Sequence, residues 1–214
     1  MNRTFFEESA YKEGCRLIAG VDEAGRGPLA GPVVAAACIL PRALHIEGID
    51  DSKKLTAGQR EELYHILTTH PEIFYGIGIV ENALIDEMNI LRASLHAMAL
   101  AVKELSKEPD YLLIDGNHLP PTQILSKAVI KGDSRSVSIG AASIIAKHKR
   151  DLLMLEYHEK FPHYGFDKHK GYGTKLHIEA LKTYGPCPIH RKSFEPVKSL
   201  TYPDDSVITK AQQP

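Results

Sequence analysis

The sequence contains little cysteine and no apolar run long enough to cross a membrane. Its three cysteines, Cys15, Cys38 and Cys187, are isolated from one another, which excludes a disulfide framework and a zinc site of the C-x-x-C type. The apolar run at residues 32–40 is only about half the length of a membrane-spanning helix. Residues 1–11 lack the basic start and apolar stretch of an export signal. We therefore expect buried or bystander thiols in a cytoplasmic protein without membrane contact.

Linkers, internal repeats and low-complexity segments are also missing from the first 200 residues. The length of 214 residues suits one domain with a substantial apolar core. We expect this domain to span residues 1–200, with about residues 174–200 as a C-terminal appendage and residues 201–214 as a loose polar tail. For a chain of this size we expect a monomer.

The net charge of −1 conceals an asymmetry between the two halves of the chain. Residues 1–110 carry 11 Lys and Arg against 17 Asp and Glu, whereas residues 111–214 carry 15 against 10 and hold seven of the 11 histidines. A basic half is compatible with a surface that binds phosphates, and equally with an ordinary solvated surface. The charge pattern leaves both interpretations open.

Hydrophobic periodicity predicts strands that alternate with helices. Short apolar runs predict buried strands at residues 15–21, 33–40, 74–80, 111–114 and 126–130. Apolar residues at helical spacing, with Thr56 and Thr174 as N-caps, predict helices at residues 56–69, 90–105, 136–161 and 174–183. This alternation is typical of an α/β fold.

Acidic residues follow three of the predicted strands. Asp22 and Glu23 follow the first strand, Asp115 follows the fourth, and Asp133 comes shortly after the fifth. If the strand ends lie side by side, these carboxylates repel one another unless a cation neutralises them, and hard oxygen ligands select Mg²⁺ or Mn²⁺. Two such ions support phosphoryl transfer. A lone Asp after a strand is more often a turn former or a helix cap, so the spacing alone leaves both interpretations open.

The glycine-rich segment AGRGPLAGP lies between the first two predicted strands. The spacing of Gly25, Gly27 and Gly31 differs from G-x-G-x-x-G, and the segment leads into an apolar run instead of opening a helix, which excludes a dinucleotide-binding loop. No G-x-x-x-x-G-K-[ST] phosphate loop occurs either. Gly25, Arg26 and Gly27 can present exposed backbone and one cation to a sugar-phosphate, or they can form a tight turn.

With these features in view, the chain resembles the bacterial ribonuclease HII family. The resemblance covers about residues 16–197 and rests on motifs that follow in the family's order: GVDEAGRGPLAGPVVAAA at 20–37, DSKKL at 51–55, IDGN at 114–117, KGD at 131–133, AASIIAK at 141–147, KGYGT at 170–174 and GPCPIHRKSF at 185–194. DEAGRGP and AASIIAK are specific signals, whereas IDGN and KGD are weak alone. The departures from the family pattern are small: the pair His148 and Lys149, which follows AASIIAK, and His169, which precedes KGYGT.

The resemblance implies a ribonuclease H-like fold, a mixed five-stranded sheet flanked by helices with a small C-terminal helical segment. It implies two-metal catalysis with Mg²⁺ or Mn²⁺ held by Asp22, Glu23, Asp115 and Asp133. The implied reaction is hydrolysis on the 5′ side of a ribonucleotide, which leaves a 3′-hydroxyl and a 5′-phosphate. The implied substrates are RNA/DNA hybrids and DNA duplexes that contain single ribonucleotides.

The resemblance also implies a set of substrate-binding residues. Gly25, Arg26 and Gly27 would read the 2′-hydroxyl that distinguishes RNA from DNA, largely through backbone groups. Tyr172 would stack on the sugar after the ribonucleotide, and the residues expected to hold phosphates are Lys53, Ser143 and Lys147. A core or surface aromatic and solvated lysines are the alternatives. We expect all 11 histidines on the surface and assign no catalytic histidine.

Two other functions stay open at this point. A ribonuclease HIII is the alternative within the same enzyme class, although only about 15 residues precede the first predicted strand and that type carries an additional N-terminal substrate-binding domain. A nucleic-acid-binding protein without catalysis would also account for the basic second half. Such a protein would tolerate loss of the acidic residues.

Overall fold

The computed structural model describes residues 3–49 and 55–201. Five strands form one sheet in the order β3-β2-β1-β4-β5. Their bounds are β1 (Ile18–Ala24), β2 (Val33–Ile39), β3 (Phe74–Val80), β4 (Tyr111–Asp115) and β5 (Leu125–Val129). The first three strands pair antiparallel, whereas β1, β4 and β5 pair parallel, so the sheet is mixed. The predicted α/β class and the mixed five-stranded sheet are confirmed.

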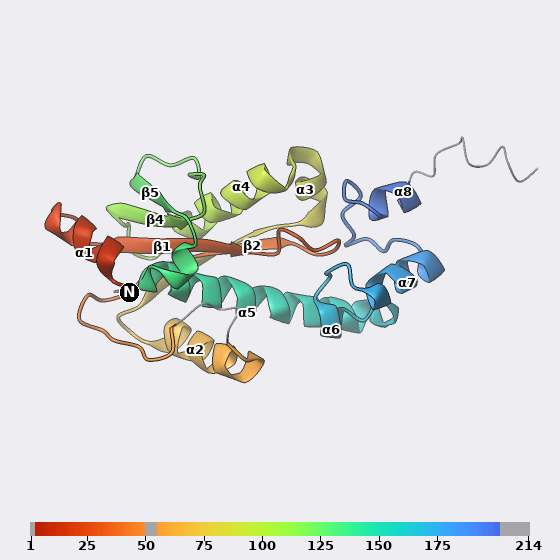
Figure 1. Ribbon diagram of the computed structural model, residues 1–214, viewed down its shortest axis with the longest axis horizontal. Coiled ribbons are helices and arrows are strands. Elements are labelled where there is room, and N and C mark those ends of the chain that lie inside the picture. The colour runs from red at the N-terminus through yellow and green to blue at the C-terminus, as the bar shows by residue number, and fades with distance from the viewer. Residues whose placement is uncertain (1–2, 50–54, 202–214) are drawn as a thin grey trace, which may run out of the picture.

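Helices cover both faces of this sheet (Figure 1). They are α1 (Phe5–Lys12), α2 (Ala57–Thr69), α3 (Asn82–Met88), α4 (Ile90–Lys103), α5 (Val137–Lys160), α6 (Phe166–His169), α7 (Lys175–Tyr184) and α8 (Val197–Thr201), with single 3₁₀ turns η1 (Gly132–Ser134) and η2 (Pro162–Tyr164). Helices α3 and α4 lie on one face of the sheet and α2 and α5 on the other, with α6 to α8 beyond one end. Among residues 3–49 and 55–201, no helix combines the length and apolar character that crossing a lipid bilayer requires.

Small apolar residues let the helices approach the sheet closely. On one face, Val21 of β1 shares a buried cluster with Ala93 and Ala97 of α4. On the other face, Ala36 of β2 shares a cluster with Ile145 of α5. Burial of this kind stabilises by roughly 25 cal/mol for each Å² of apolar surface removed from water. The sheet and the helices on its two faces are therefore closely packed.

A third apolar cluster lies at the C-terminal end of the chain. It joins Leu29, which follows the glycine-rich segment, to Met154 of α5, Phe166 of α6, Leu181 of α7 and Val197 of α8. The C-terminal helices therefore pack against the first third of the chain. The domain boundary at residue 200 stays a prediction, and the tail expected at 201–214 lies almost wholly outside the described residues.

The longer elements match the sequence predictions closely because their signals are local. The Thr56 side chain accepts a hydrogen bond from the Gln59 amide, and the Gln59 side chain accepts one from the Thr56 amide, so α2 begins with a capping box. Thr174 caps α7 in the predicted place. The first strand differs from its prediction: it begins at Ile18, three residues late, and contains Asp22 and Glu23 because β2 continues to pair with it there. The short helices α1, α3, α6 and α8 were not predicted.

Candidate active site

Asp22 and Asp115 lie beside each other because of the register of two parallel strands. β1 and β4 pair up to Val21 and Ile114, so the next residue of each strand is an aspartate at the carboxyl end of the sheet. Strand residues alternate between faces, and Gly20 lies against the backbone of α5, so Asp22 is also directed toward α5. The parallel register thus brings together two acids that are far apart in the sequence.

Burial and repulsion raise the pKa of Asp22 well above its ordinary value. The residue is 4% exposed, and burial is the largest cause, followed by the negative charges of Glu23 and Asp115. Hydrogen bonds from Ser143 and from the Glu23 amide oppose the shift. A carboxylate in this environment gains free energy from a nearby cation.

Glu23 has a cation beside it in the structure. Its Oε1 lies 3.1 Å from Nη1 of Arg26, whose side chain is half exposed. Burial raises the pKa of Glu23, while Arg26 lowers it through its charge and a hydrogen bond. The glycine-rich segment therefore contributes both a cation and a tight turn to the acidic cluster.

Asp133 lies in a turn that is hydrogen-bonded to Asp115. Its 3₁₀ turn, η1, is tied to β4 because the amide of Gly132 donates to Oδ1 of Asp115 over 2.6 Å. Asp133 is 6% exposed, and its own Oδ1 accepts from the Ser134 amide over 2.9 Å. Within residues 3–49 and 55–201, no three His, Cys, Asp or Glu side chains are spaced to hold a metal ion. The metal-ligand role of the four acids therefore stays a prediction.

A cleft of about 530 Å³ contains most of the residues that the sequence singled out. Its lining is Asp22, Glu23, Ala24, Gly25, Arg26, Gly27, Arg60, Asp115, Ser143, Lys147 and Tyr172. Of the predicted site residues, Asp133 is buried and does not line the cleft, and Lys53 lies outside the described residues. Acids and cations thus meet in one hollow at the carboxyl ends of β1 and β4.

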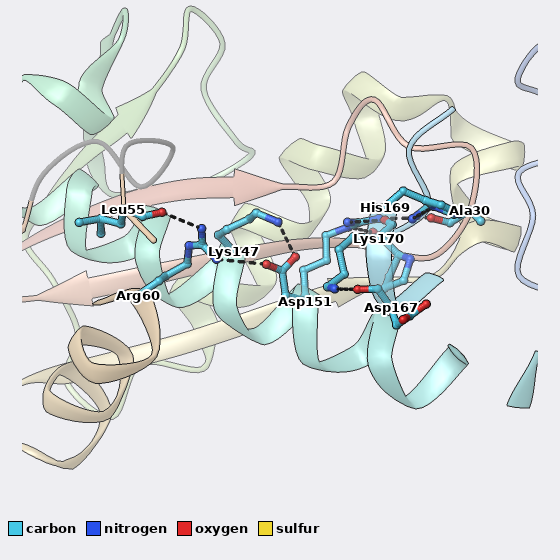
Figure 2. A network of polar contacts seen from close by, with 11 residues as sticks. Ala30, Leu55, Arg60, Lys147, Asp151, Asp167, His169 and Lys170 are labelled. Atoms are coloured by element: carbon cyan, nitrogen blue, oxygen red, sulfur yellow. Dashed lines mark hydrogen bonds and ion pairs between the residues drawn. The ribbon is translucent and has the colours of Figure 1, made fainter. Parts of the chain in front are cut away.

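Two cations of the cleft, Lys147 and Arg60, are held by a carboxylate on α5. Figure 2 shows Asp151 bound to both Lys147 and Arg60, with Nη1 of Arg60 at 3.3 Å from Oδ2 of Asp151. Nη2 of Arg60 also donates to the Leu55 carbonyl over 3.2 Å. Burial lowers the pKa of Lys147, and Asp151 opposes that shift. Sequence reasoning missed Arg60, since it lies on α2 in no recognisable motif.

Tyr172 faces the glycine-rich segment across the cleft. A Cβ added at Gly27 would lie 3.6 Å from Cε1 of Tyr172, which is ordinary contact distance. The amide of Leu29 donates to the Gly171 carbonyl over 2.8 Å and so ties the two segments together. Tyr172 is 45% exposed. An aromatic face and a glycine backbone are therefore available to the same ligand.

The expectation that all histidines lie on the surface is wrong for His169, His177 and His190, which are 9%, 0% and 0% exposed. Nδ1 of His190 accepts from the Cys187 amide over 2.9 Å, so its Nε2 donates to Nε2 of His177 over 2.9 Å. Nδ1 of His177 then donates to the Tyr172 carbonyl over 3.0 Å.

This one-way hydrogen-bond chain requires neutral rings. Burial lowers the pKa of both His177 and His190 to about 4. The apolar side of α7 was the available sequence signal, because His177 is directed inward with Ala180 and Leu181. The buried chain supports the turn that presents Tyr172.

Comparison with known proteins gives consistent matches over most of the chain. The family described as Ribonuclease HII matches residues 19–197. The Ribonuclease HII of Chlamydia caviae is 58% identical over 200 residues, which cover 94% of each protein. The crystal structure of the ribonuclease H2 from Pyrococcus horikoshii superposes with a TM-score of 0.71 at 30% identity, covering 86% of this chain and 97% of that one. A Bst-RNase HIII structure in complex with Mn²⁺ has a TM-score of 0.64 at 20% identity and covers 98% and 74%, respectively, a likeness of fold alone.

Proposed function

The chain belongs to the ribonuclease HII family and is a ribonuclease, and we propose that it cuts the RNA strand of RNA/DNA hybrids and nicks duplex DNA on the 5′ side of single embedded ribonucleotides. The products would be a 3′-hydroxyl and a 5′-phosphate. Family membership decides against a ribonuclease HIII, the alternative within the same enzyme class. It also decides against a binding protein without catalysis.

The observation that carries the proposal is the acidic corner of the cleft beside Gly27 and Tyr172. Asp22, Glu23 and Asp115 line it, and burial raises the pKa of Asp22 and Glu23. Members of this family depend on a divalent metal. We propose that Asp22, Glu23, Asp115 and Asp133 hold two Mg²⁺ or Mn²⁺ ions, because an all-carboxylate donor set suits hard cations and buried like charges need neutralising. When bound, such ions supply an activated water and stabilise the leaving oxygen.

The remaining cleft residues would grip the nucleic acid. Backbone groups of residues 25–27 would contact the 2′-hydroxyl, and the half-exposed ring of Tyr172 would stack on the following sugar. Lys147, with Arg60 beside the same Asp151, would attract phosphate. Ser143 donates to Asp22 in the structure, so a phosphate contact from it would come in addition to that bond. Lys53 stays a prediction outside the described residues.

The test is a DNA duplex with one ribonucleotide, run beside an all-RNA/DNA hybrid with Mg²⁺, with Mn²⁺ and with EDTA. We expect Asp22→Asn and Asp115→Asn each to abolish metal-dependent nicking of both substrates while circular dichroism and the melting temperature show an intact fold. EDTA should abolish nicking by the native protein. Undiminished nicking by both variants would remove the proposed mechanism.

A further inference from the structure

A buried arginine near the other end of the chain donates hydrogen bonds to carbonyl groups of the glycine-rich segment. Arg191 is 0% exposed, and its Nη2 donates to the Gly25 carbonyl over 2.6 Å. Its Nη1 donates to the Arg26 carbonyl and its Nε to the Gly31 carbonyl, each over 3.0 Å. The guanidinium therefore bonds to the backbone on both sides of the turn.

The buried charge of Arg191 depends on its hydrogen bonds to the carbonyls of the turn. None of the ion pairs among the described residues involves Arg191. Burial, aided by the charge of Arg150, lowers its pKa to about 9, so it still carries a proton at neutral pH. A buried charge is expensive unless hydrogen bonds satisfy it, and here backbone carbonyls satisfy it. Loss of the guanidinium would leave these carbonyls without their donors.

The bonds to Gly25 and Arg26 also orient the amides that follow. In a trans peptide the C=O of one residue and the N–H of the next point in opposite directions. Because the carbonyls of Gly25 and Arg26 are drawn inward to Arg191, the amides of Arg26 and Gly27 point away from it. Both residues line the cleft, and within the described chain neither amide donates a hydrogen bond to another group. These two donors are available to a ligand in the cleft.

We propose that Arg191 is a positioning residue for ribose recognition, because it sets the direction of the Arg26 and Gly27 amides that meet the 2′-hydroxyl. The inference rests on the proposed role of residues 25–27 in reading that hydroxyl. Arg191 does not touch the substrate itself, since it is fully buried. It acts indirectly, by fixing the two peptide groups whose carbonyls belong to Gly25 and Arg26.

Arg150 provides a matched control for this role. It is 1% exposed, and it also donates to backbone carbonyls: Pro32 and Lys170 over 3.0 Å and Ala30 over 3.2 Å. None of its bonds reaches the carbonyls of Gly25 or Arg26. The two arginines thus match in burial and in type of partner, and both donate to the Pro32 carbonyl. Only Arg191 also holds the carbonyls of Gly25 and Arg26.

The experiment compares Arg191→Lys with Arg150→Lys, since lysine keeps the charge and loses the planar fork of donors. The readouts are kcat/KM on the duplex with one ribonucleotide and affinity for the all-DNA duplex of the same sequence. We expect Arg191→Lys to lower kcat/KM at least about tenfold while affinity for DNA changes less than twofold. The two variants should lower the melting temperature by similar amounts. Arg150→Lys should keep the ribose preference closer to that of the native protein.

The outcomes separate this inference from the proposed function. Native protein that fails to nick at a ribonucleotide refutes the proposed function. If the native protein nicks, two results overturn the role of Arg191. One is a folded Arg191→Lys that keeps the full ribose preference, and the other is an Arg150→Lys that loses as much of the ribose preference as Arg191→Lys. If Arg191→Lys does not fold, the native protein decides: the amide resonances of Arg26 and Gly27 must shift with the ribonucleotide duplex and not with the DNA duplex, and unchanged resonances overturn the inference.

Discussion

The contact between β1 and α5 at Gly20 allows a quantitative prediction. A Cβ built on Gly20 would lie 2.0 Å from the carbonyl carbon of Ser138 and 2.2 Å from the amide nitrogen of Ile139. Ordinary van der Waals contact for a Cβ begins at 3.4 Å. Gly20→Ala therefore requires the strand and the helix to separate by about 1.4 Å at this point.

The magnitude follows from which atoms are in contact. Overpacking a core costs about 1–3 kcal/mol, and backbone atoms cannot rotate away as a side chain can, so we expect about 3 kcal/mol. For a chain of this size that loss lowers the melting temperature by roughly 6–12 °C. The same helix carries Ser143 and Lys147 into the cleft, and a displacement of about 1 Å in a catalytic site can lower the rate about 100-fold. We expect loss of both stability and kcat.

Gly78→Ala is the control, because it makes an equally close contact on the other face of the sheet. Its Cβ would lie 2.0 Å from the Ala97 carbonyl oxygen of α4, a helix that contributes no residue to the cleft. The assays are urea unfolding and initial rates of nicking at a saturating concentration of the one-ribonucleotide duplex. We expect similar destabilisation from both substitutions and a large fall in kcat from Gly20→Ala alone. A cost below about 1 kcal/mol for Gly20→Ala, or an equal fall in kcat for both variants, would refute the reasoning.

Three further predictions concern the surroundings of the cleft. Asp151→Asn removes the carboxylate that holds Lys147 and Arg60, so KM for the ribonucleotide duplex should rise about fivefold with little change in kcat, and a fall in kcat alone would contradict this. Tyr172→Ala should weaken binding about tenfold while Tyr172→Phe keeps the ring and the affinity; equal Kd values for the two variants would exclude stacking. The free energy of unfolding should fall as pH drops from 6.5 to 4, because burial lowers the pKa of folded His177 to about 4 and the unfolded chain takes up the proton first. That loss is on the order of 2 kcal/mol, and urea titrations of His177→Asn should show a shallower dependence in this range.

The sequence by itself determined the strands, the longer helices and the chemical type of the site. Thr56 and Thr174 mark the starts of their helices because a cap needs only residues within the next turn. The strands at residues 33–39 and 74–80 could be predicted because continuous apolar runs between turn residues are a local signal. The motifs around Asp22, Asp115 and Tyr172 identified the family for the same reason, since each is a short run of adjacent residues.

Only the tertiary structure decided which of these groups meet. The one-residue step beyond the last pair of β1 and β4 sets Asp22 beside Asp115, and a sequence contains no record of strand register. Arg191 bonds to the Gly25 carbonyl across 166 positions, and His177 and His190 are neutral because the fold removes them from water. Hydrogen bonds, burial and charge depend on distance in space, whereas caps and apolar runs depend on distance along the chain.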